Sequence, residues 1–257
     1  MASRQPDGPP PPPTVQRVRL RYTKRGRLRF TSHRDISRVV ERAVRRARLP
    51  IAHSAGFSPH PRISWVGAAP TGVASEAEYV EIGLTEVRDV EQVRRALDEV
   101  LPAGLDLLDA VTAVQAGFAD RMQASVFCLQ LPGARAGQVG EALLAFDRAS
   151  EVFVERRTKS GLKPVDVRAA VVSLVVKDPA DDTCVILRLV VRHTTPVVRP
   201  DDVLTGLRAL APLELDSPLV ATRLAQGPLR QSDADGAEPG VDDPLAPDRA
   251  AEGREPG

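Results

Sequence analysis

Residues 17–50 read RVRLRYTKRGRLRFTSHRDISRVVERAVRRARLP, and this stretch contains the two patterns that decide the fold. In residues 17–22, Arg alternates with Val, Leu and Tyr, which predicts a strand with one buried face and one basic face. Ser32, followed three positions later by Asp35, predicts the start of a helix. Apolar residues then recur at helical spacing until Pro50, which cannot continue a helix. The stretch therefore predicts a strand followed by an amphipathic helix.

The same patterns continue along the rest of the chain. In the first half we expect a short segment at 28–30, a rigid loop at 56–61, strands at 62–66, 79–84 and 105–114, and a helix at 90–101. The second half has predicted strands at 124–131, 152–156, 169–176, 184–192 and 219–224, and helices at 136–146 and 201–210. The order in the first half is β-α-β-β-α-β, which is typical of ferredoxin-like folds. The predicted fold class is therefore α+β, with two tandem ferredoxin-like halves and an extra hairpin in the second.

Composition sets the predicted domain boundaries. A proline run and an acidic end rich in Gly, Pro and Ala flank the patterned region, and such segments rarely bury enough apolar surface to fold. The predicted segments are a disordered lead at 1–14, a basic first half at 15–117, a second half at 118–226 and a disordered acidic tail at 227–257.

The overall composition excludes several classes of protein. The chain has 257 residues, of which 42% are hydrophobic and 27% charged, as in globular proteins. Two cysteines are too few for a disulfide scaffold or for a Cys-ligated zinc or iron–sulfur site built from this chain alone. The sequence contains neither a long apolar run nor an apolar signal segment. We therefore expect a cytoplasmic protein with no membrane partner, no metal and no cofactor.

Charge is unevenly distributed along the chain. The formal net charge is only +1, yet residues 1–64 hold fifteen basic and three acidic residues, a local charge of +12. Residues 227–257 hold eight acids and three bases, a local charge of −5. Such asymmetry indicates an anionic partner for the first segment. Because arginines outnumber lysines thirty-one to four throughout the chain, the clustering of charge is more informative than the choice of Arg.

The candidate anion-binding residues follow from this clustering and from a basic turn in the second half. Arginines on the open face of the first sheet and on the polar face of the first helix would form one basic surface suited to phosphates. A solvated face, or one covered by the second half of the chain through salt bridges, is the alternative. The candidates are Arg17, Arg19, Arg21, Arg27, Arg29, Arg34, Arg38, Arg62, Lys159, Lys163 and Arg168.

Two histidines lie in unusual local settings. His33 follows Ser32 at the predicted helix start, and His60 lies between two prolines in the 56–61 loop. If the two segments meet, the histidines form a candidate acid/base pair, or metal ligands together with Asp35. The alternatives are helix capping by Ser32 and Asp35 and a loop-anchoring role for His60. Glu76 and Glu78 lie close together just before a predicted strand, and they have either an acid/base or metal role or a place in a polar loop.

These motifs together resemble the radical-SAM-linked protein family, a bacterial family of unknown function. The motif residues are Ser32, His33 and Asp35, then Gly56, Phe57, Pro59, His60 and Pro61, then Gly72, Val73, Ser75 and Glu76. Residues 158–168, which include Asp166, resemble the family's second landmark. Members are encoded beside, or fused to, a radical SAM enzyme. Because this chain does not contain a three-Cys cluster motif, the resemblance implies a companion protein with a radical SAM partner.

Three functions remain open at this point. The first is a non-catalytic companion of a radical SAM enzyme that binds RNA or another anionic substrate through the basic first half. The second is a metal-independent, ribonuclease-like enzyme using His33 and His60. The third is a protein–protein adaptor whose arginines meet acidic partners or the chain's own acidic tail.

Overall fold

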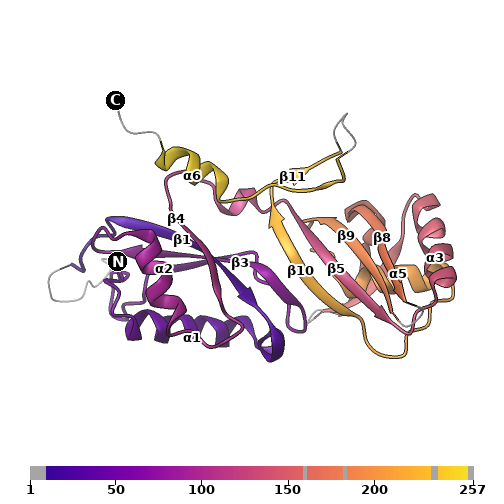
Figure 1. The fold of residues 1–257 in the computed structure, drawn as a ribbon, viewed down its shortest axis with the longest axis horizontal. Coiled ribbons are helices and arrows are strands. Elements are labelled where there is room, and N and C mark those ends of the chain that lie inside the picture. Colours follow the sequence, from indigo (N-terminus) through magenta and orange to yellow (C-terminus); the bar gives the residue numbers. More distant parts are fainter. Residues whose placement is uncertain (1–9, 159–160, 182–183, 233–236, 254–257) are drawn as a thin grey trace. The chain divides into compact units, whose positions relative to one another are not determined.

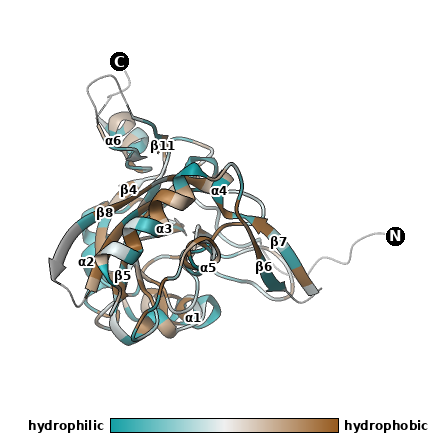
Figure 2. Cartoon of the chain, turned by 90° about the vertical axis from the view of Figure 1, so that its right-hand side faces the viewer, coloured by the Kyte–Doolittle hydropathy of each residue, from teal (hydrophilic) through white to brown (hydrophobic). Residues whose placement is uncertain are grey.

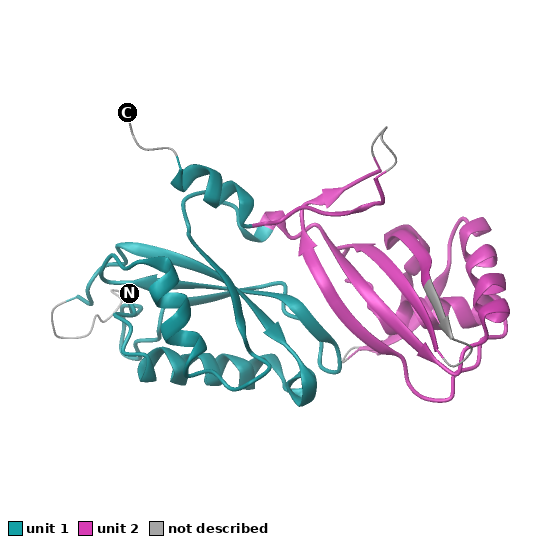
Figure 3. Cartoon of the chain, in the orientation of Figure 1, with its two compact units in different colours: residues 1–119, 245–257 teal, residues 120–244 magenta. Residues whose placement is uncertain are grey.

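A computed structural model describes residues 10–158, 161–181, 184–232 and 237–253. It is an α+β structure in which the paired strands run mostly antiparallel (Figure 1). The chain divides into two compact units (Figure 3). Unit 1 comprises residues 1–119 and 245–257, and unit 2 comprises residues 120–244. No helix among the described residues is long and apolar enough to cross a membrane.

Unit 1 contains one four-stranded antiparallel sheet in the order β4-β1-β3-β2. Its elements are β1 (Gln16–Lys24), the 3-10 helix η1 (Gly26–Phe30), α1 (His33–Arg46), β2 (Ile63–Val66), β3 (Ala74–Leu84), α2 (Val90–Asp98), β4 (Leu107–Thr112) and α6 (Ala246–Glu252). The helices α1 and α2 lie on one side of the strands and α6 lies on the other (Figure 1).

The core of unit 1 lies between this sheet and its two long helices. Val18, Leu20 and Tyr22 project from one face of β1 and pack with Ile36 and Val40 of α1. Each fully buried aliphatic side chain of this kind stabilises the folded state by about 1.5–3 kcal/mol. The apolar side chains at every second position of β1 therefore pack against those that recur every 3.6 residues in α1, and together they form one layer. The arginines of β1 occupy the opposite face of the sheet.

Local sequence signals define both ends of α1. The Ser32 side chain accepts a hydrogen bond from the Asp35 backbone N–H, as expected for an N-cap residue. At the other end Arg48 adopts a positive φ of 52°, which stops the helix before Pro50. The short segment at 28–30 differs from our prediction because it is part of η1, and the side chain of Phe30 is 59% exposed.

In unit 2, four strands pair antiparallel in the order β10-β5-β9-β8. Its elements are β5 (Ala124–Pro132), α3 (Ala136–Arg148), β6 (Phe153–Thr158), β7 (Gly161–Asp166), α4 (Val167–Ala170), β8 (Val171–Asp181), β9 (Cys184–Arg192), α5 (Pro200–Leu210), β10 (Val220–Gly227), β11 (Leu229–Arg230) and β12 (Gly240–Val241). The short 3-10 helix η2 (Ala119–Arg121) spans the boundary between the units. Strands β6 and β7 pair only with each other among the described strands, and both hydrophobic and hydrophilic segments appear on this hairpin (Figure 2).

The acidic tail differs from our expectation of disorder. Within the described part of 227–257, residues form β11, β12 and α6. Leu245 and Asp248 are fully buried, and Arg249 forms an ion pair with Asp109 of β4 at 2.5 Å. The tail has few apolar residues, but one leucine and a set of ion pairs are enough to hold α6 against β4. Residues 1–9 of the predicted lead lie outside the described residues.

Candidate anion-binding surface

The arginine row of β1 lies on the sheet face away from α1 and α2, but its central member is sequestered. Arg19 is only 5% exposed, and its guanidinium donates to Glu81 at 2.9 Å and to Asp248 at 2.6 Å. It also donates to the Gln115 carbonyl at 2.8 Å and lies 4.5 Å from the centroid of the Phe118 ring. Our prediction that Arg19 faces an external anion therefore disagrees with the structure, because acids of the same chain already bind it.

The neighbouring positions of the row are also engaged. Arg21 donates from Nε to the Glu76 carbonyl at 2.8 Å. The Glu76 carboxylate accepts from Arg25 Nε at 2.6 Å, and Arg25 lies 3.6 Å from Asp106. The hydrogen bond to Glu76 raises the pKa of Arg25 above its ordinary value. Glu76 lies within β3 and not in a polar loop, and its carboxylate forms an ion pair with Arg25.

The polar face of α1 offers a larger accessible group of cations. We call the following five side chains, all of them exposed, the α1 surface: Arg34, Arg38, Arg42, Arg45 and Arg46. Arg38 lies 3.5 Å from Asp35, and Arg45 lies 3.9 Å from Glu41. Exposed pairs of this kind are worth at most about 1 kcal/mol. The other three guanidinium groups form no hydrogen bond or ion pair with any described residue, so they are available to an external anion.

The arginines of η1, just before α1, have different surroundings. Arg27 is exposed and its side chain bonds to no described residue. The guanidinium of Arg29 lies 4.6 Å from the centroid of the Phe30 ring, and its Nε is buried without a described hydrogen-bond partner. Arg27 therefore adds an accessible charge close in sequence to the α1 surface, whereas Arg29 packs against an aromatic ring.

The two candidate catalytic histidines make separate local contacts. The exposed His33 ring forms a T-shaped pair with the Trp65 ring of β2, with centroids 5.1 Å apart. His60 donates its backbone N–H to Ser54 Oγ at 3.0 Å, and its carbonyl accepts from the Ser54 N–H at 2.8 Å. Among the described residues no hydrogen bond joins His33 to His60, and no group of three His, Cys, Asp or Glu could hold a metal ion. His33 thus packs on a ring, and His60 closes a loop.

The loop around His60 presents an aromatic side chain. Phe57 is 71% exposed, and Gly56 before it has a φ of +122°, a conformation that favours glycine. The remaining loop residues of the motif, Pro59 and Pro61, restrict the backbone on both sides of His60. The motif therefore builds a stiff loop with an exposed ring at its tip.

The second landmark lies in unit 2. Asp166 caps α4 by accepting from the backbone N–H of Arg168 at 3.0 Å, and the Arg168 guanidinium lies over the Phe146 ring. Lys163 is exposed on β7, opposite Arg156, which is ion-paired with Asp202. The predicted contact at Lys159 lies outside the described residues. Of this group, Lys163 is accessible, whereas Asp166 and Arg168 have local structural contacts.

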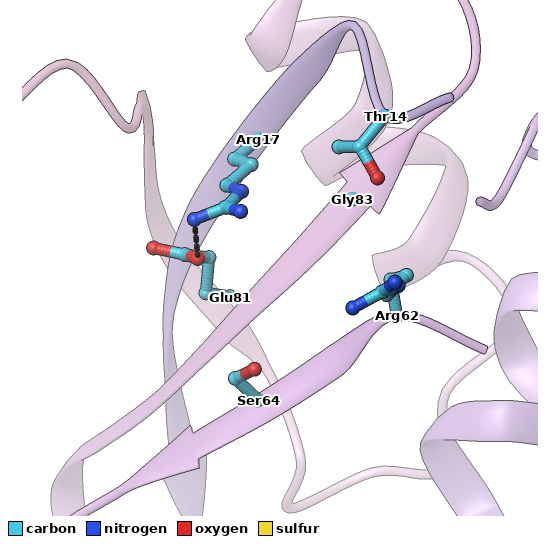
Figure 4. Close-up of a pocket in the computed structure, with 6 residues that line it drawn as sticks. All are labelled: Thr14, Arg17, Arg62, Ser64, Glu81 and Gly83. Carbon is cyan, nitrogen blue, oxygen red and sulfur yellow. Dashed lines mark ion pairs between the residues drawn. The ribbon is translucent and has the colours of Figure 1, made fainter. Parts of the chain in front are cut away.

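Sequence reasoning missed four residues, among them Glu81, that lie beside Arg17 and Arg62. A pocket on the α6 side of the unit 1 sheet is lined by Thr14, Arg17, Arg62, Ser64, Glu81 and Gly83 (Figure 4). Thr14, Ser64 and Gly83 belong to no recognisable motif, because strand register alone brings them together. The only sequence signal for this pocket was the clustering of positive charge in the first segment, and that clustering identified Arg17 and Arg62 alone.

Comparison with known proteins gives one family match. The family described as "Uncharacterized protein conserved in bacteria (DUF2344)" matches residues 17–200. This range includes the α1 surface, the 56–61 loop and the β6–β7 hairpin, and it ends at the first residue of α5. No curated protein matches the chain.

Proposed function

Because the chain belongs to DUF2344, a family of uncharacterized proteins conserved in bacteria, we propose a function from its own residues. The protein is a non-catalytic companion of a radical SAM enzyme, and it binds RNA through the α1 surface. The observation that carries the RNA-binding part is the set of α1 guanidinium groups without a described partner. The radical SAM partner rests on the resemblance of the motif residues alone.

The α1 surface suits a phosphate backbone because its charges are fixed on a rigid element. Ile36, Val40, Ala43 and Val44 anchor the other face of α1 in the core. The arginines therefore project from a helix that does not need to order on binding. Each phosphate that is neutralised releases condensed counterions, which favours binding at low salt.

Exposed aromatic rings favour RNA over other polyanions. Phe30 and Phe57 are 59% and 71% exposed, one just before α1 and one in the loop before β2. Single-stranded RNA is recognised largely by stacking of bases on such rings, together with arginine contacts. Rings and arginines in the same unit are thus the combination expected for single-stranded RNA.

A non-catalytic role agrees with the contacts of the two candidate histidines. His33 packs edge-on against Trp65, and His60 makes backbone hydrogen bonds with Ser54. None of the described contacts joins the two imidazole rings, so the acid/base pair required by the ribonuclease alternative has no support here, and we favour the companion function.

We also infer that both units are ferredoxin-like. In unit 1, the order β1-α1-β2-β3-α2-β4 with the sheet order β4-β1-β3-β2 supports this inference. In unit 2, β5-α3-β8-β9-α5-β10 with the sheet order β10-β5-β9-β8 follows the same arrangement. The β6–β7 hairpin and α4 are then an insertion after α3.

RNA binding is tested by charge removal with a matched control. The variant Arg34→Gln/Arg42→Gln/Arg46→Gln loses the three unpaired arginines of the α1 surface. We expect about tenfold weaker binding of a fluorescent single-stranded RNA. We also expect a salt slope smaller by about 2, since each phosphate contact with a single strand contributes about 0.7. The readout is fluorescence anisotropy across a salt series.

The control removes the same charge from unit 2. The exposed residues Arg135, Arg148 and Arg192 are replaced by Gln in one variant. If both triple variants lose affinity equally, net charge and not the α1 surface determines binding. Unchanged affinity in the α1 variant overturns the RNA-binding proposal.

The radical SAM partner is tested by purifying the tagged full chain from its native cells and identifying the co-purified proteins by mass spectrometry. Absence of a radical SAM enzyme from the enriched proteins overturns this part of the proposal.

A further inference from the structure

We propose that the pocket on the α6 side of the unit 1 sheet binds a terminal phosphate group, as carried by a phosphate monoester. The pocket lies on the opposite face of the sheet from α1. The phosphate-binding proposal therefore does not rest on the RNA-binding proposal. The pocket would bind a small ligand, whereas the α1 surface would bind a polymer.

Strand register places two arginines on either side of a glycine. Arg17 of β1 is the partner of Gly83 on β3, and on the other side the Gly83 N–H donates to the Arg62 carbonyl at 2.8 Å. Neighbouring strands lie about 4.8 Å apart, so the two arginine backbones are separated by about 10 Å. Two long side chains that start this far apart are able to approach one anion from opposite sides. Figure 4 shows both guanidinium groups around the pocket.

Gly83 keeps the floor of the pocket open. A Cβ atom at this position would lie 3.0 Å from Thr14 Cγ2 and 3.1 Å from Arg62 Cβ. Any larger side chain would occupy the space between the two arginines. Gly83 therefore serves close approach here, and its conformation is ordinary, since its φ is not among the positive values of the chain.

The pocket contains hydrogen-bond donors with no described partner. The Arg62 guanidinium and the Thr14 and Ser64 hydroxyl groups form no hydrogen bond to any described residue. Arg17 is 64% exposed and lies 3.7 Å from Glu81, whose carboxylate is bound more closely by Arg19 at 2.9 Å. Two guanidinium groups and two hydroxyls are thus available to a ligand.

This set of donors matches a phosphate better than a carboxylate. A carboxylate is planar, and one guanidinium fork satisfies it. A terminal phosphate is tetrahedral and has three strong acceptor oxygens, which suit donors that converge from two sides. It also carries close to two negative charges near neutral pH. Glu81 also lines the pocket, and its negative charge, which opposes an anion there, is offset by its ion pairs with Arg19 at 2.9 Å and Arg17 at 3.7 Å.

The test is calorimetric titration of the full chain with adenosine 5′-monophosphate, inorganic phosphate and adenosine. We expect the monophosphate to bind and adenosine not to bind. Arg62→Gln should weaken monophosphate binding about tenfold or more, because it removes a charged donor of the clamp. Arg192→Gln is the matched control, an exposed arginine of unit 2, and it should bind as the unaltered chain does.

The outcomes separate the sources of the phosphate and the two proposals. Tighter binding of the monophosphate than of inorganic phosphate supports an ester ligand, and equal binding supports free phosphate at the same site. Equal binding by Arg62→Gln and the unaltered chain, or no binding of either phosphate, overturns the proposal. The α1 triple variant should keep its phosphate binding, so failure of RNA binding and failure of this site are distinguishable. Gly83→Ala, with its melting temperature measured in parallel, should also weaken binding by narrowing the pocket.

Discussion

The buried pair of Arg19 and Asp248 predicts that α6 is an integral part of unit 1. The Asp248 side chain is fully buried and accepts from Arg19 at 2.6 Å and from the backbone N–H groups of Val114 and Gln115 at 3.0 and 2.8 Å. Asp248→Asn removes the fully buried one of the two carboxylates that bind Arg19, and Glu81 at 2.9 Å is then its remaining acidic partner. The substitution also replaces one carboxylate oxygen, which accepts hydrogen bonds, by an NH₂ group that can only donate, although the surrounding groups are themselves donors. Removing one partner of a buried ion pair costs about 3–5 kcal/mol, which is the loss of unfolding free energy that we expect.

The measurement uses the single tryptophan of the chain. Trp65 lies in β2 of unit 1, so its fluorescence during urea unfolding reports on this unit. Glu99→Gln, at an exposed acid of the same unit, is the control and should change stability by less than about 0.5 kcal/mol. Replacing both Arg19 and Asp248 by leucine should recover only part of the loss, because Glu81 then keeps only the longer contact with Arg17 at 3.7 Å and the N–H groups of Val114 and Gln115 lose their acceptor. A loss below about 1 kcal/mol for Asp248→Asn would refute the argument, because an exposed pair costs no more than that.

Two further predictions concern pH and helix capping. Burial lowers the pKa of His193, whose ring nitrogens bond to Ser125 Oγ at 2.8 Å and to the Met122 carbonyl at 2.7 Å. The neutral His193 ring stabilises the fold fully at pH values above its unfolded-state pKa of about 6.5, and this contribution is lost as the pH falls through its lower folded-state pKa. The urea concentration at the midpoint of unfolding should therefore decline below about pH 6.5, and it should decline less in His193→Gln. Ser32→Ala removes the N-cap of α1 and should cost about 1 kcal/mol in the same urea assay, whereas no change would mean that the cap contributes nothing.

Local patterns were sufficient for the main elements of unit 1. The alternation in residues 17–22 lies within β1, and the capped apolar stripe after Ser32 became α1. Both patterns involve only residues within one or two helical turns or along one strand, so they can be recognised without knowing which element packs against them. The concentration of arginines in the first segment could also be predicted, because charge is a property of composition.

The accessibility of those arginines was a tertiary property. Arg19 meets an acid 229 positions later in the chain, and nothing near either residue indicates the other. The same contact orders a tail whose composition predicted disorder. An isolated segment of this composition does not bury enough apolar surface to fold, but the tail has a buried leucine and a cationic partner supplied by unit 1.

The sequence by itself determined the main strands and helices between residues 16 and 227 and the concentration of positive charge in the first segment, because these follow from periodicity and composition. Only the tertiary structure decided which arginines are accessible to a ligand and which are neutralised. Only the tertiary structure placed Thr14, Ser64 and Gly83 beside Arg17 and Arg62. The reason is physical: a one-residue change of register would turn every side chain of a strand to the other face, so a pocket built across three segments depends on pairings that no single segment specifies.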